Sequence, residues 1–132
     1  MAISYSWTKN FKTEELEELF LSVEWESGKY PAKLQKALLN SHKVYSVWDG
    51  ERLIGMINSM TDTVLTVYFQ YLLVHPDYQG HGLGKKLVGE MLEIYSDIPR
   101  KILISVEEQV GFYQHCGFTH HTDKAPMFVS TL

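Results

Sequence analysis

The segment Val74–Leu87 places a glycine-rich loop between a predicted strand and a predicted helix. The strand is the run of β-branched and aromatic residues from Thr63 to Val74, which suits a central position in a sheet with both faces covered. The helix follows from apolar residues at helical spacing, which are Leu83, Leu87, Val88, Met91, Leu92 and Tyr95. Unpaired N–H groups and the dipole at the start of such a helix favour an anion. The junction therefore predicts a pyrophosphate-binding loop.

The glycines of this loop are Gly80, Gly82 and Gly84, and without side chains they allow close approach of the backbone to a ligand. Lys85 and Lys86 follow at the first helical turn, where they oppose the dipole unless an anion is present. Two familiar phosphate loops are excluded. The nucleotide-hydrolase loop needs serine or threonine after its lysine, and the dinucleotide fingerprint needs a glycine where Lys85 stands.

The other elements are predicted from periodicity and turn residues. In chain order we expect a helix over Thr13–Ser27 capped by Thr13, a helix from Pro31 to about Ser41, a hairpin of Val44–Val47 and Leu53–Ile57 around Asp49-Gly50, the strand and helix described above with the helix ending near Asp97, a strand over Lys101–Val106, a helix over Glu107–His115 and a strand over Met127–Val129. This order predicts an α+β fold (α/β layered), with a central sheet flanked by helices. A chain of 132 residues with 45% hydrophobic residues suits a single domain spanning residues 1–132.

Charge and cysteine content narrow the partners and the compartment. A net charge of −4 lacks the basic excess that nucleic-acid or anionic-membrane binding requires, so we expect neither partner. The single cysteine, Cys116, cannot form an internal disulfide, which favours a reducing cytoplasm. No leader pattern opens the sequence, and no apolar run approaches the roughly 18 residues of a membrane span. The prediction is a cytoplasmic protein.

Gln79, Gly82 and Gly84 fit the pattern of Gln or Arg, two residues, Gly, one residue, then Gly or Ala. Through this pattern the sequence resembles the GNAT superfamily of acyl-CoA-dependent N-acyltransferases. The segment Gly111–Phe118 looks like a second family element, Phe-Tyr, three residues, Gly-Phe. Two motifs in the right order are more specific than either alone, and the resemblance covers most of the chain. It implies a GNAT-like mixed sheet, mostly antiparallel, with a splayed pair of parallel strands.

The resemblance also implies how an acyl donor is held. Acetyl-CoA would lie in a V-shaped gap between the parallel strands, which here are Tyr68–Val74 and Ile102–Val106. Backbone groups near Leu73 and Val74 would bind the pantetheine arm and polarise the acyl carbonyl, and the amides of the loop would hold the pyrophosphate. The predicted donor-binding residues are Leu73, Val74, Gln79, Gly80, His81, Gly82, Leu83, Gly84 and Lys85.

Family chemistry implies that an amine attacks the thioester directly, without an acyl-enzyme. Tyr113 matches the family position that stabilises or protonates the departing thiolate, so it is the predicted catalytic residue. The sequence leaves open which group acts as the general base that deprotonates the amine. Gln70 and Tyr71 stand where many members carry a carboxylate, and Glu107 and Glu108 either act through water or only complement a helix dipole. An amine that arrives deprotonated, or a water chain, is the remaining alternative.

Other reactive side chains have structural interpretations. Cys116 beside His115 suggests a nucleophile, but neighbours on a helix face different ways, so a packed thiol is preferred. Only His120 and His121 are adjacent histidines, which predicts no metal site. The family architecture points to an acceptor cleft near Glu24, Trp25, Glu26, Tyr30 and Asp62, although tryptophan is more often core and glutamates more often solvated.

The resulting hypothesis is an N-acetyltransferase that uses acetyl-CoA and a primary amine of a small molecule. A catalytically weak CoA-binding or regulatory module is one alternative, motivated by the missing strand carboxylate. A peptide or protein N-terminal acetyltransferase is another. The aromatic C-terminal region and the frequent dimers of the family favour a homodimer. The sequence does not identify the acceptor amine or the preferred acyl chain.

Overall fold

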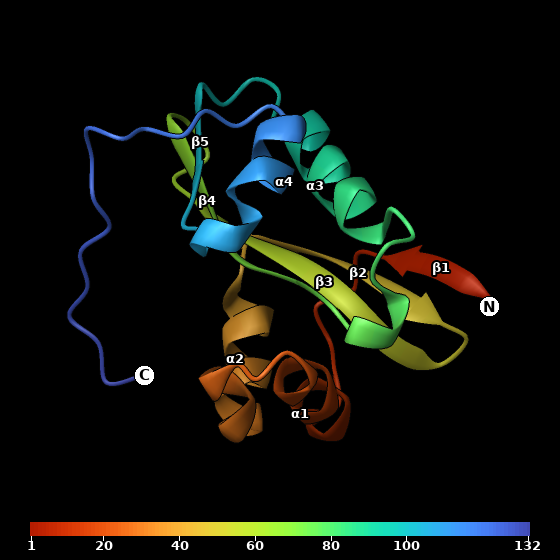
Figure 1. Cartoon of the computed structure of the whole chain (residues 1–132). Helices are drawn as coiled ribbons and strands as arrows, with labels where there is room; N and C mark the ends of the chain where they lie inside the picture. Colours follow the sequence, from red (N-terminus) through yellow and green to blue (C-terminus); the bar gives the residue numbers. More distant parts are fainter.

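The computed structural model describes all 132 residues and consists of a five-stranded sheet with helices on both faces (Figure 1). The strands lie side by side in chain order, and they are β1 (Ile3–Ser6), β2 (Lys43–Asp49), β3 (Arg52–Thr61), β4 (Thr66–Val74) and β5 (Arg100–Leu103). The pairs from β1 to β4 are antiparallel, whereas β5 runs parallel to β4. The predicted layered fold with a mixed, mostly antiparallel sheet is confirmed.

Two pairs of helices cover the sheet, and they are α1 (Thr13–Ser22) with α2 (Pro31–Asn40), and α3 (Leu83–Ile94) with α4 (Val110–His115). The first pair lies against one face and the second against the other (Figure 1). Three short 3-10 helices complete the chain, η1 (Glu26–Lys29), η2 (Pro76–Tyr78) and η3 (Glu107–Gln109). None of the helices combines the length and the apolar character that crossing a bilayer demands.

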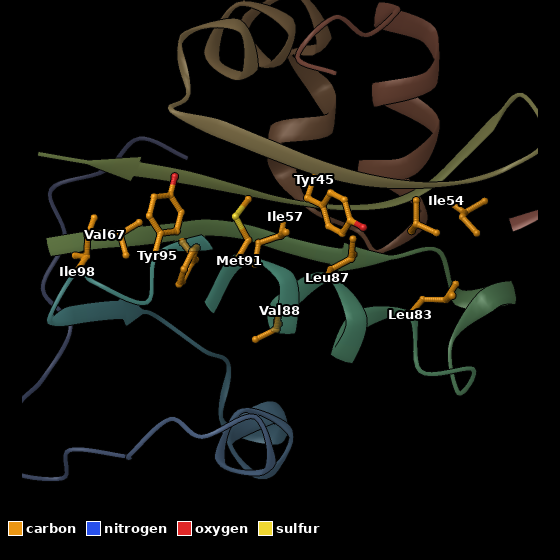
Figure 2. Close-up of a cluster of buried hydrophobic side chains, with 12 residues drawn as sticks. Tyr45, Ile54, Ile57, Val67, Leu83, Leu87, Val88, Met91, Tyr95 and Ile98 are labelled. Carbon is orange, nitrogen blue, oxygen red and sulfur yellow. The ribbon is translucent and has the colours of Figure 1, made fainter. Parts of the chain in front are cut away.

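Each face of the sheet has its own hydrophobic core. Under α3, the side chains of Leu87, Val88 and Met91 belong to one cluster with Ile57 of β3 (Figure 2). Under α1 and α2, Met56 of β3 belongs to a second cluster, with Leu16, Leu19, Phe20, Leu34 and Leu38. Neighbouring residues of β3 thus serve opposite cores, as the alternation of side chains along a strand requires.

The first helix is shorter than its sequence pattern suggests. It ends at Ser22, because Glu24 adopts a left-handed φ of 60° and the chain then enters η1. The prediction that Thr13 caps this helix is wrong. Leu16 N–H already donates to Lys12 O, so Thr13 is the first helical residue, and the Glu15 carboxylate accepts the Lys12 N–H at 2.8 Å.

Two further differences concern the ends of the chain. Strand β1 was not predicted, because its four residues alternate apolar and serine side chains too briefly to stand out. The predicted strand over Met127–Val129 is wrong. A strand needs a hydrogen-bonded neighbour, and this segment has none: Met127 is 91% exposed and Phe128 is 68% exposed. The other predicted elements are present with boundaries shifted by a few residues.

Candidate donor-binding site

Strand β4 loses one of its two neighbours halfway along. In its first half, Val67–Phe69 pair with β3 on one edge, and Thr66–Phe69 pair with Arg100–Leu103 of β5 on the other. From Gln70 onward only the β3 edge is paired, because β5 ends at Leu103. The second half of β4 therefore has a row of backbone groups with no strand opposite them.

The pairing with β3 contains a bulge at the point where β5 leaves. Ile57 lies opposite Leu72 and Ser59 lies opposite Phe69, so Gln70 and Tyr71 together face one residue of β3, Asn58. A bulge of this kind inserts one extra residue and bends the strand that carries it. It separates the fully paired half of β4 from the open half.

Beyond the bulge, the register decides which amides face the open side. His75 N–H donates to Ile54 O at 2.7 Å, and Leu73 lies opposite Met56 in the same register. Hydrogen-bonded pairs alternate along an antiparallel ladder, so Leu73 also directs its N–H toward β3. The N–H groups of Leu72 and Val74 then point to the side that β5 vacates. Of the two strand residues predicted to bind the donor, Val74 directs its N–H to the open side and Leu73 directs its N–H toward β3.

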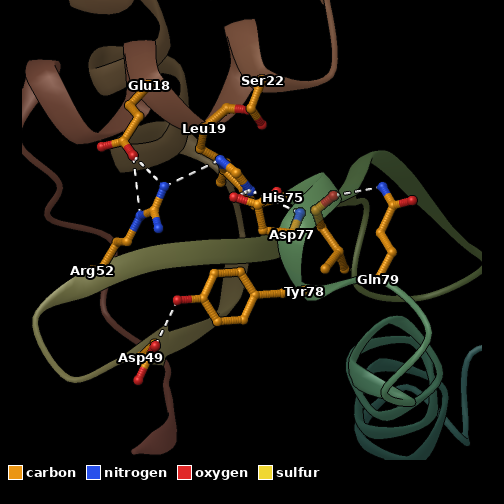
Figure 3. A network of polar contacts seen from close by, with 10 residues as sticks. Glu18, Leu19, Ser22, Asp49, Arg52, His75, Asp77, Tyr78 and Gln79 are labelled. Atoms are coloured by element: carbon orange, nitrogen blue, oxygen red, sulfur yellow. Dashed lines mark hydrogen bonds and ion pairs between the residues drawn. The ribbon is translucent and has the colours of Figure 1, made fainter. Parts of the chain in front are cut away.

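The glycine-rich loop continues directly from this open half. Gln79 is exposed and its side-chain amide donates to Val74 O at 2.9 Å, which holds the loop against the end of β4 (Figure 3). Gly80 and Gly82 have φ values of 84° and 77°, and a Cβ at either position would meet nothing within 4 Å. The left-handed backbone, rather than lack of space, therefore requires glycine at both positions.

At the start of α3 the backbone offers several unpaired donors. The first helical hydrogen bond of α3 runs from Lys86 N–H to Gly82 O, so the preceding N–H groups of Leu83, Gly84 and Lys85 have no partner within the helix. Together with the positive end of the helix dipole, these groups form a cradle that suits an anion such as a pyrophosphate.

The two lysines of this turn have different roles. Lys86 forms an ion pair with Glu90 at 3.1 Å and lies over the ring of Tyr5 at 5.6 Å, so its charge is already neutralised within the protein. Lys85 is exposed and forms no ion pair. His81, which is also exposed, lies in the same loop. Lys85 is therefore the cation that remains available to an anionic ligand.

A polar network that was not predicted supports the loop from the other side (Figure 3). Tyr78 of η2 donates its hydroxyl to Asp49 at 2.6 Å, and this hydrogen bond is the main reason why the pKa of Asp49 is lowered. Arg52 contacts His75 at 3.2 Å and donates to Glu18 of α1 at 2.8 Å. The network ties the turn before the loop to the β2–β3 hairpin and to α1. These residues are scattered along the chain, so no local pattern could reveal them.

Tyr113, the predicted catalytic residue, lies on α4 with its ring against Phe112 and Phe118. Burial, and to a smaller extent the neighbouring Cys116, raise the pKa of its phenol to about 12. The hydroxyl has no hydrogen-bond partner within the chain. Tyr113 also lines a cavity of about 990 Å³ between β5, α4 and the C-terminal segment. It is therefore a neutral donor that can serve a ligand.

A close contact joins the two sequence motifs. A Cβ placed on Gly84, in the first turn of α3, would lie 3.4 Å from the ring of Phe112 on α4 and 3.8 Å from the Val74 side chain. The glycine-rich loop, the end of β4 and the aromatic helix α4 thus meet at one point. Helix α4, which carries Tyr113, is positioned by the same residues that form the cradle.

Aromatic residues lie beside the open half of β4 on the face covered by α1. The rings of Trp25 and Tyr71 have centroids 6.0 Å apart, and both lie near Phe20. Ser27 of η1 is within hydrogen-bonding distance of the Tyr71 hydroxyl, at 3.2 Å. Glu24, Glu26 and Tyr30 are exposed in the same region. The side chains expected near an acceptor are thus gathered around η1 and the bulge.

Asp62 is the exception among the expected acceptor residues. Its carboxylate accepts the N–H groups of Val64, Leu65 and Thr66, at 2.9, 2.9 and 3.1 Å. These backbone hydrogen bonds, that of Val64 first, lower the pKa of Asp62. Asp62 therefore closes the turn between β3 and β4, which is a structural role.

The remaining reactive groups are also located. Gln70 is exposed at the bulge, and Glu107 and Glu108 are exposed in η3. Cys116 is half-buried at the end of α4 beside Tyr113, and burial raises the pKa of its thiol, which opposes a role as a nucleophile. No three His, Cys, Asp or Glu side chains come together in a group that could hold a metal ion.

Comparison with known proteins gives a consistent result. The family described as "Acetyltransferase (GNAT) domain" matches residues 40–120. A protein of Prochlorococcus marinus named "Uncharacterized N-acetyltransferase ycf52-like" is 35% identical over 121 residues, covering 87% of this chain and 67% of the relative. The histone acetyltransferase TAP1 of Glycine max is 33% identical over 100 residues, covering 66% of this chain and 43% of the relative. The structure of the GNAT family protein SP0256 from Streptococcus pneumoniae superposes with a TM-score of 0.80 at 26% identity, over 98% of this chain and 99% of that one.

Proposed function

We propose that this chain, which belongs to the GNAT acetyltransferase family, transfers an acetyl group from acetyl-CoA to a primary amine of a small-molecule acceptor. The observation that carries the proposal is the open edge of β4 from Gln70 to Val74, which leads directly into the anion cradle at the start of α3. An extended ligand with a pyrophosphate at one end matches this combination, and few other ligands do.

The backbone would recognise the donor. The main-chain groups of Leu72 and Val74 would hydrogen-bond an extended arm as a further strand would, and the amides from Gln79 to Lys85 would hold the pyrophosphate. Bound acetyl-CoA supplies an activated thioester carbonyl. The N–H of Leu72 faces the open side close to the bulge, where it can polarise that carbonyl. Lys85 adds the one positive charge near the phosphates that no acidic side chain neutralises.

Tyr113 would stabilise the leaving group by donating a hydrogen bond. A phenol with a pKa of about 12 is a weaker acid than a thiol, whose usual pKa is about 8.5, so complete proton transfer to a thiolate is unfavourable. A hydrogen bond to the thiolate in a partly buried position is favourable. Tyr113 then acts as a catalytic donor that keeps its own proton.

The attacking amine would lose its proton to water. Strand β4 carries Gln70 and Tyr71 at the bulge and no carboxylate there, and Glu107 and Glu108 are exposed to solvent in η3. Amines that are partly neutral near pH 7 are therefore expected to react fastest. The aromatic residues Trp25 and Tyr71 would form one wall of the acceptor cleft.

A peptide or protein amine is the second candidate acceptor, because a relative at 33% identity is named as a histone acetyltransferase. A homodimer is also part of the proposal. The outer edge of β5 is unpaired and the C-terminal segment exposes Met127 and Phe128, so a second copy could cover both. The lone Cys116 agrees with a reducing compartment such as the cytoplasm.

The proposal is tested by release of free CoA from acetyl-CoA in the presence of a panel of amines and peptides. Tyr113→Phe should lower turnover about 10²-fold or more and change the dissociation constant of CoA by less than about twofold. Tyr5→Phe, on β1, is the matched control and should retain full turnover. Unchanged turnover in Tyr113→Phe would show that the assigned role is wrong. Binding of CoA without any release across the panel would instead favour the CoA-binding module.

A further inference from the structure

We infer that Asn58 is a positioning residue, whose side chain holds the bulge of β4 and thereby presents the N–H of Leu72 to the donor. The inference rests on the proposed function for its catalytic consequence, although its structural part can be tested without it. Asn58 lies in the middle of β3 and is 0% exposed.

The side-chain amide of Asn58 makes three hydrogen bonds. Its oxygen accepts the backbone N–H of Tyr71 at 2.8 Å. Its nitrogen donates to the Ser41 hydroxyl at 3.1 Å and to the side-chain oxygen of Gln70 at 3.3 Å. Both residues of the bulge, Gln70 and Tyr71, are thus bound by the one residue that lies opposite them.

The contact with Tyr71 replaces a missing ladder bond. A bulge leaves the N–H of one residue without a partner in the opposite strand. A buried N–H without an acceptor is strongly unfavourable, so the bulge is stable only where another group accepts that hydrogen bond. The Asn58 oxygen is this acceptor. A leucine at position 58 would fill a similar volume but would leave the Tyr71 N–H unsatisfied.

The position of the bulge determines which amides face the donor. With the N–H of Tyr71 held toward β3, the alternation along the strand directs Leu73 to β3 and Leu72 to the open side. Loss of the bulge would shift the register of the residues that follow it by one, which would reverse this pattern and turn Leu73, now 4% exposed, out of its core. The site depends on which alternate N–H groups of β4 face the open side, and Asn58 fixes that alternation.

Ser41 connects the bulge to the helical layer. Its hydroxyl accepts from Asn58 and donates to Ala37 O of α2 at 3.0 Å. The bulge therefore has a fixed position relative to α2 as well as to β3. The bulge also follows immediately after Phe69, the last residue of β4 paired with β5. Asn58 thus acts at the point where β4 loses β5 as its neighbour.

The test compares Asn58→Leu with Asn58→Asp and with a control, Ser46→Ala. Ser46 is a buried polar residue of β2 that bonds Ser6 O and Trp48, away from the cleft, so its removal destabilises the sheet without touching the bulge. Three quantities are measured: hydrogen exchange of the Tyr71 amide without ligand, the dissociation constant of CoA, and turnover.

For Asn58→Leu we expect Tyr71 exchange to rise about tenfold or more, CoA affinity to fall severalfold and turnover to fall further, by about 10²-fold. Asn58→Asp keeps an acceptor for Tyr71, and both Ser41 and Gln70 can reorient to donate to it, so it should recover Tyr71 protection and most of the turnover. Ser46→Ala should lower the unfolding temperature but change neither exchange at Tyr71 nor CoA affinity.

The inference is overturned if Asn58→Leu matches Ser46→Ala in all three quantities, or if Asn58→Asp loses Tyr71 protection as Asn58→Leu does. If Asn58→Leu does not fold, Asn58→Ala takes its place with the same expected losses. A wild-type protein that binds CoA but acetylates nothing would contradict the proposed function alone. Exchange at Tyr71 and CoA affinity would still decide the role of Asn58.

Discussion

The two halves of β4 are alike in composition and differ in their neighbours. Val67–Phe69 is paired on both edges, whereas Gln70–Val74 is paired only with β3. In the first half the backbone is fully used by the sheet. In the second half the same backbone groups alternate between the sheet and the open side. An unpaired edge arises here because β5 ends, and no special side chain along β4 is needed for it.

In the open half of β4, the side chains and the backbone have different roles. In the open half, Leu73 is buried under α1 and α2 while Leu72 and Val74 pack toward α3. All three side chains stabilise the two cores, and the N–H groups of Leu72 and Val74 are the ones that the donor would contact. Substitutions that preserve the backbone should therefore affect stability more than chemistry, and removal of an N–H that faces the open side should do the opposite.

Proline substitutions distinguish the two kinds of amide in the open half most directly, because proline removes one N–H. Leu72→Pro removes an amide that faces the open side, so the protein should fold and turnover should fall about 10²–10³-fold. Leu73→Pro removes a ladder amide and should unfold at a much lower temperature. Thermal unfolding and CoA release measure both. A folded, fully active Leu72→Pro would show that the open half contributes no donor.

The second prediction concerns the loop that the open half leads into. Gly82 has a φ of 77°, which a β-branched residue does not tolerate, so Gly82→Val should weaken CoA binding about tenfold or more. Gly89 lies exposed in α3 with open space around it, and Gly89→Ala should stabilise the protein by about 0.5–1 kcal/mol without changing affinity. Calorimetric titration with CoA checks both. Equal affinities of Gly82→Val and Gly89→Ala for CoA would contradict the proposal that the loop binds the pyrophosphate.

The third prediction concerns how the contribution of Tyr113 to turnover depends on pH. Because burial raises the pKa of Tyr113 to about 12, its phenol stays protonated up to pH values well above the usual value near 10. Its contribution is present below about pH 10 and is lost only as the pH rises through about 12. The ratio of wild-type to Tyr113→Phe turnover should therefore change by less than about twofold between about pH 7 and about pH 10. If the ratio of wild-type to Tyr113→Phe turnover falls toward one near pH 10, the pKa of Tyr113 is not raised.

The smallest effect on turnover is expected at the paired end. Asp62 closes the β3–β4 turn, so Asp62→Ala should lower the unfolding temperature and leave turnover within about twofold of wild type. The pKa of Asp62 is lowered, so its ionised form stabilises the fold above its unfolded pKa of about 3.9 and this contribution is lost as the pH falls through the lower folded value. Wild type and Asp62→Asn should therefore converge in unfolding temperature in acid. A large loss of turnover in Asp62→Ala would place the paired end in the active site.

The sequence predicted the parts of the fold that depend on local chemistry. Left-handed glycines, a strong apolar stripe and an Asp-Gly turn each constrain the backbone within a few residues, so the junction Val74–Leu87 and the β2–β3 hairpin were found. The short β1 and the end of α1 were not, because both depend on what the rest of the chain packs against them. The C-terminal segment has strand-forming residues but lacks a neighbour to pair with.

The site shows the same limit. Gln79, Gly82 and Gly84 carry a recognisable pattern, but the choice between Leu72 and Leu73 depends on the position of the bulge, which no pattern in β4 reveals. One signal was available in β3. Asn58 and Ser59 interrupt an otherwise apolar run, and a buried polar residue in a central strand calls for a specific partner.

The contact between Gly84 and Phe112 sets an upper limit on size at one position of the loop. A methyl group at residue 84 would just touch the ring at 3.4 Å, and a side chain extending further in this direction would have to move the Phe112 ring or the Val74 side chain. This limit accounts for the pattern at that position, which admits glycine or alanine and nothing bulkier. Phe112 thus limits the size of the side chain at position 84, although the two residues are far apart in the sequence. A larger side chain at either position would require a smaller one at the other.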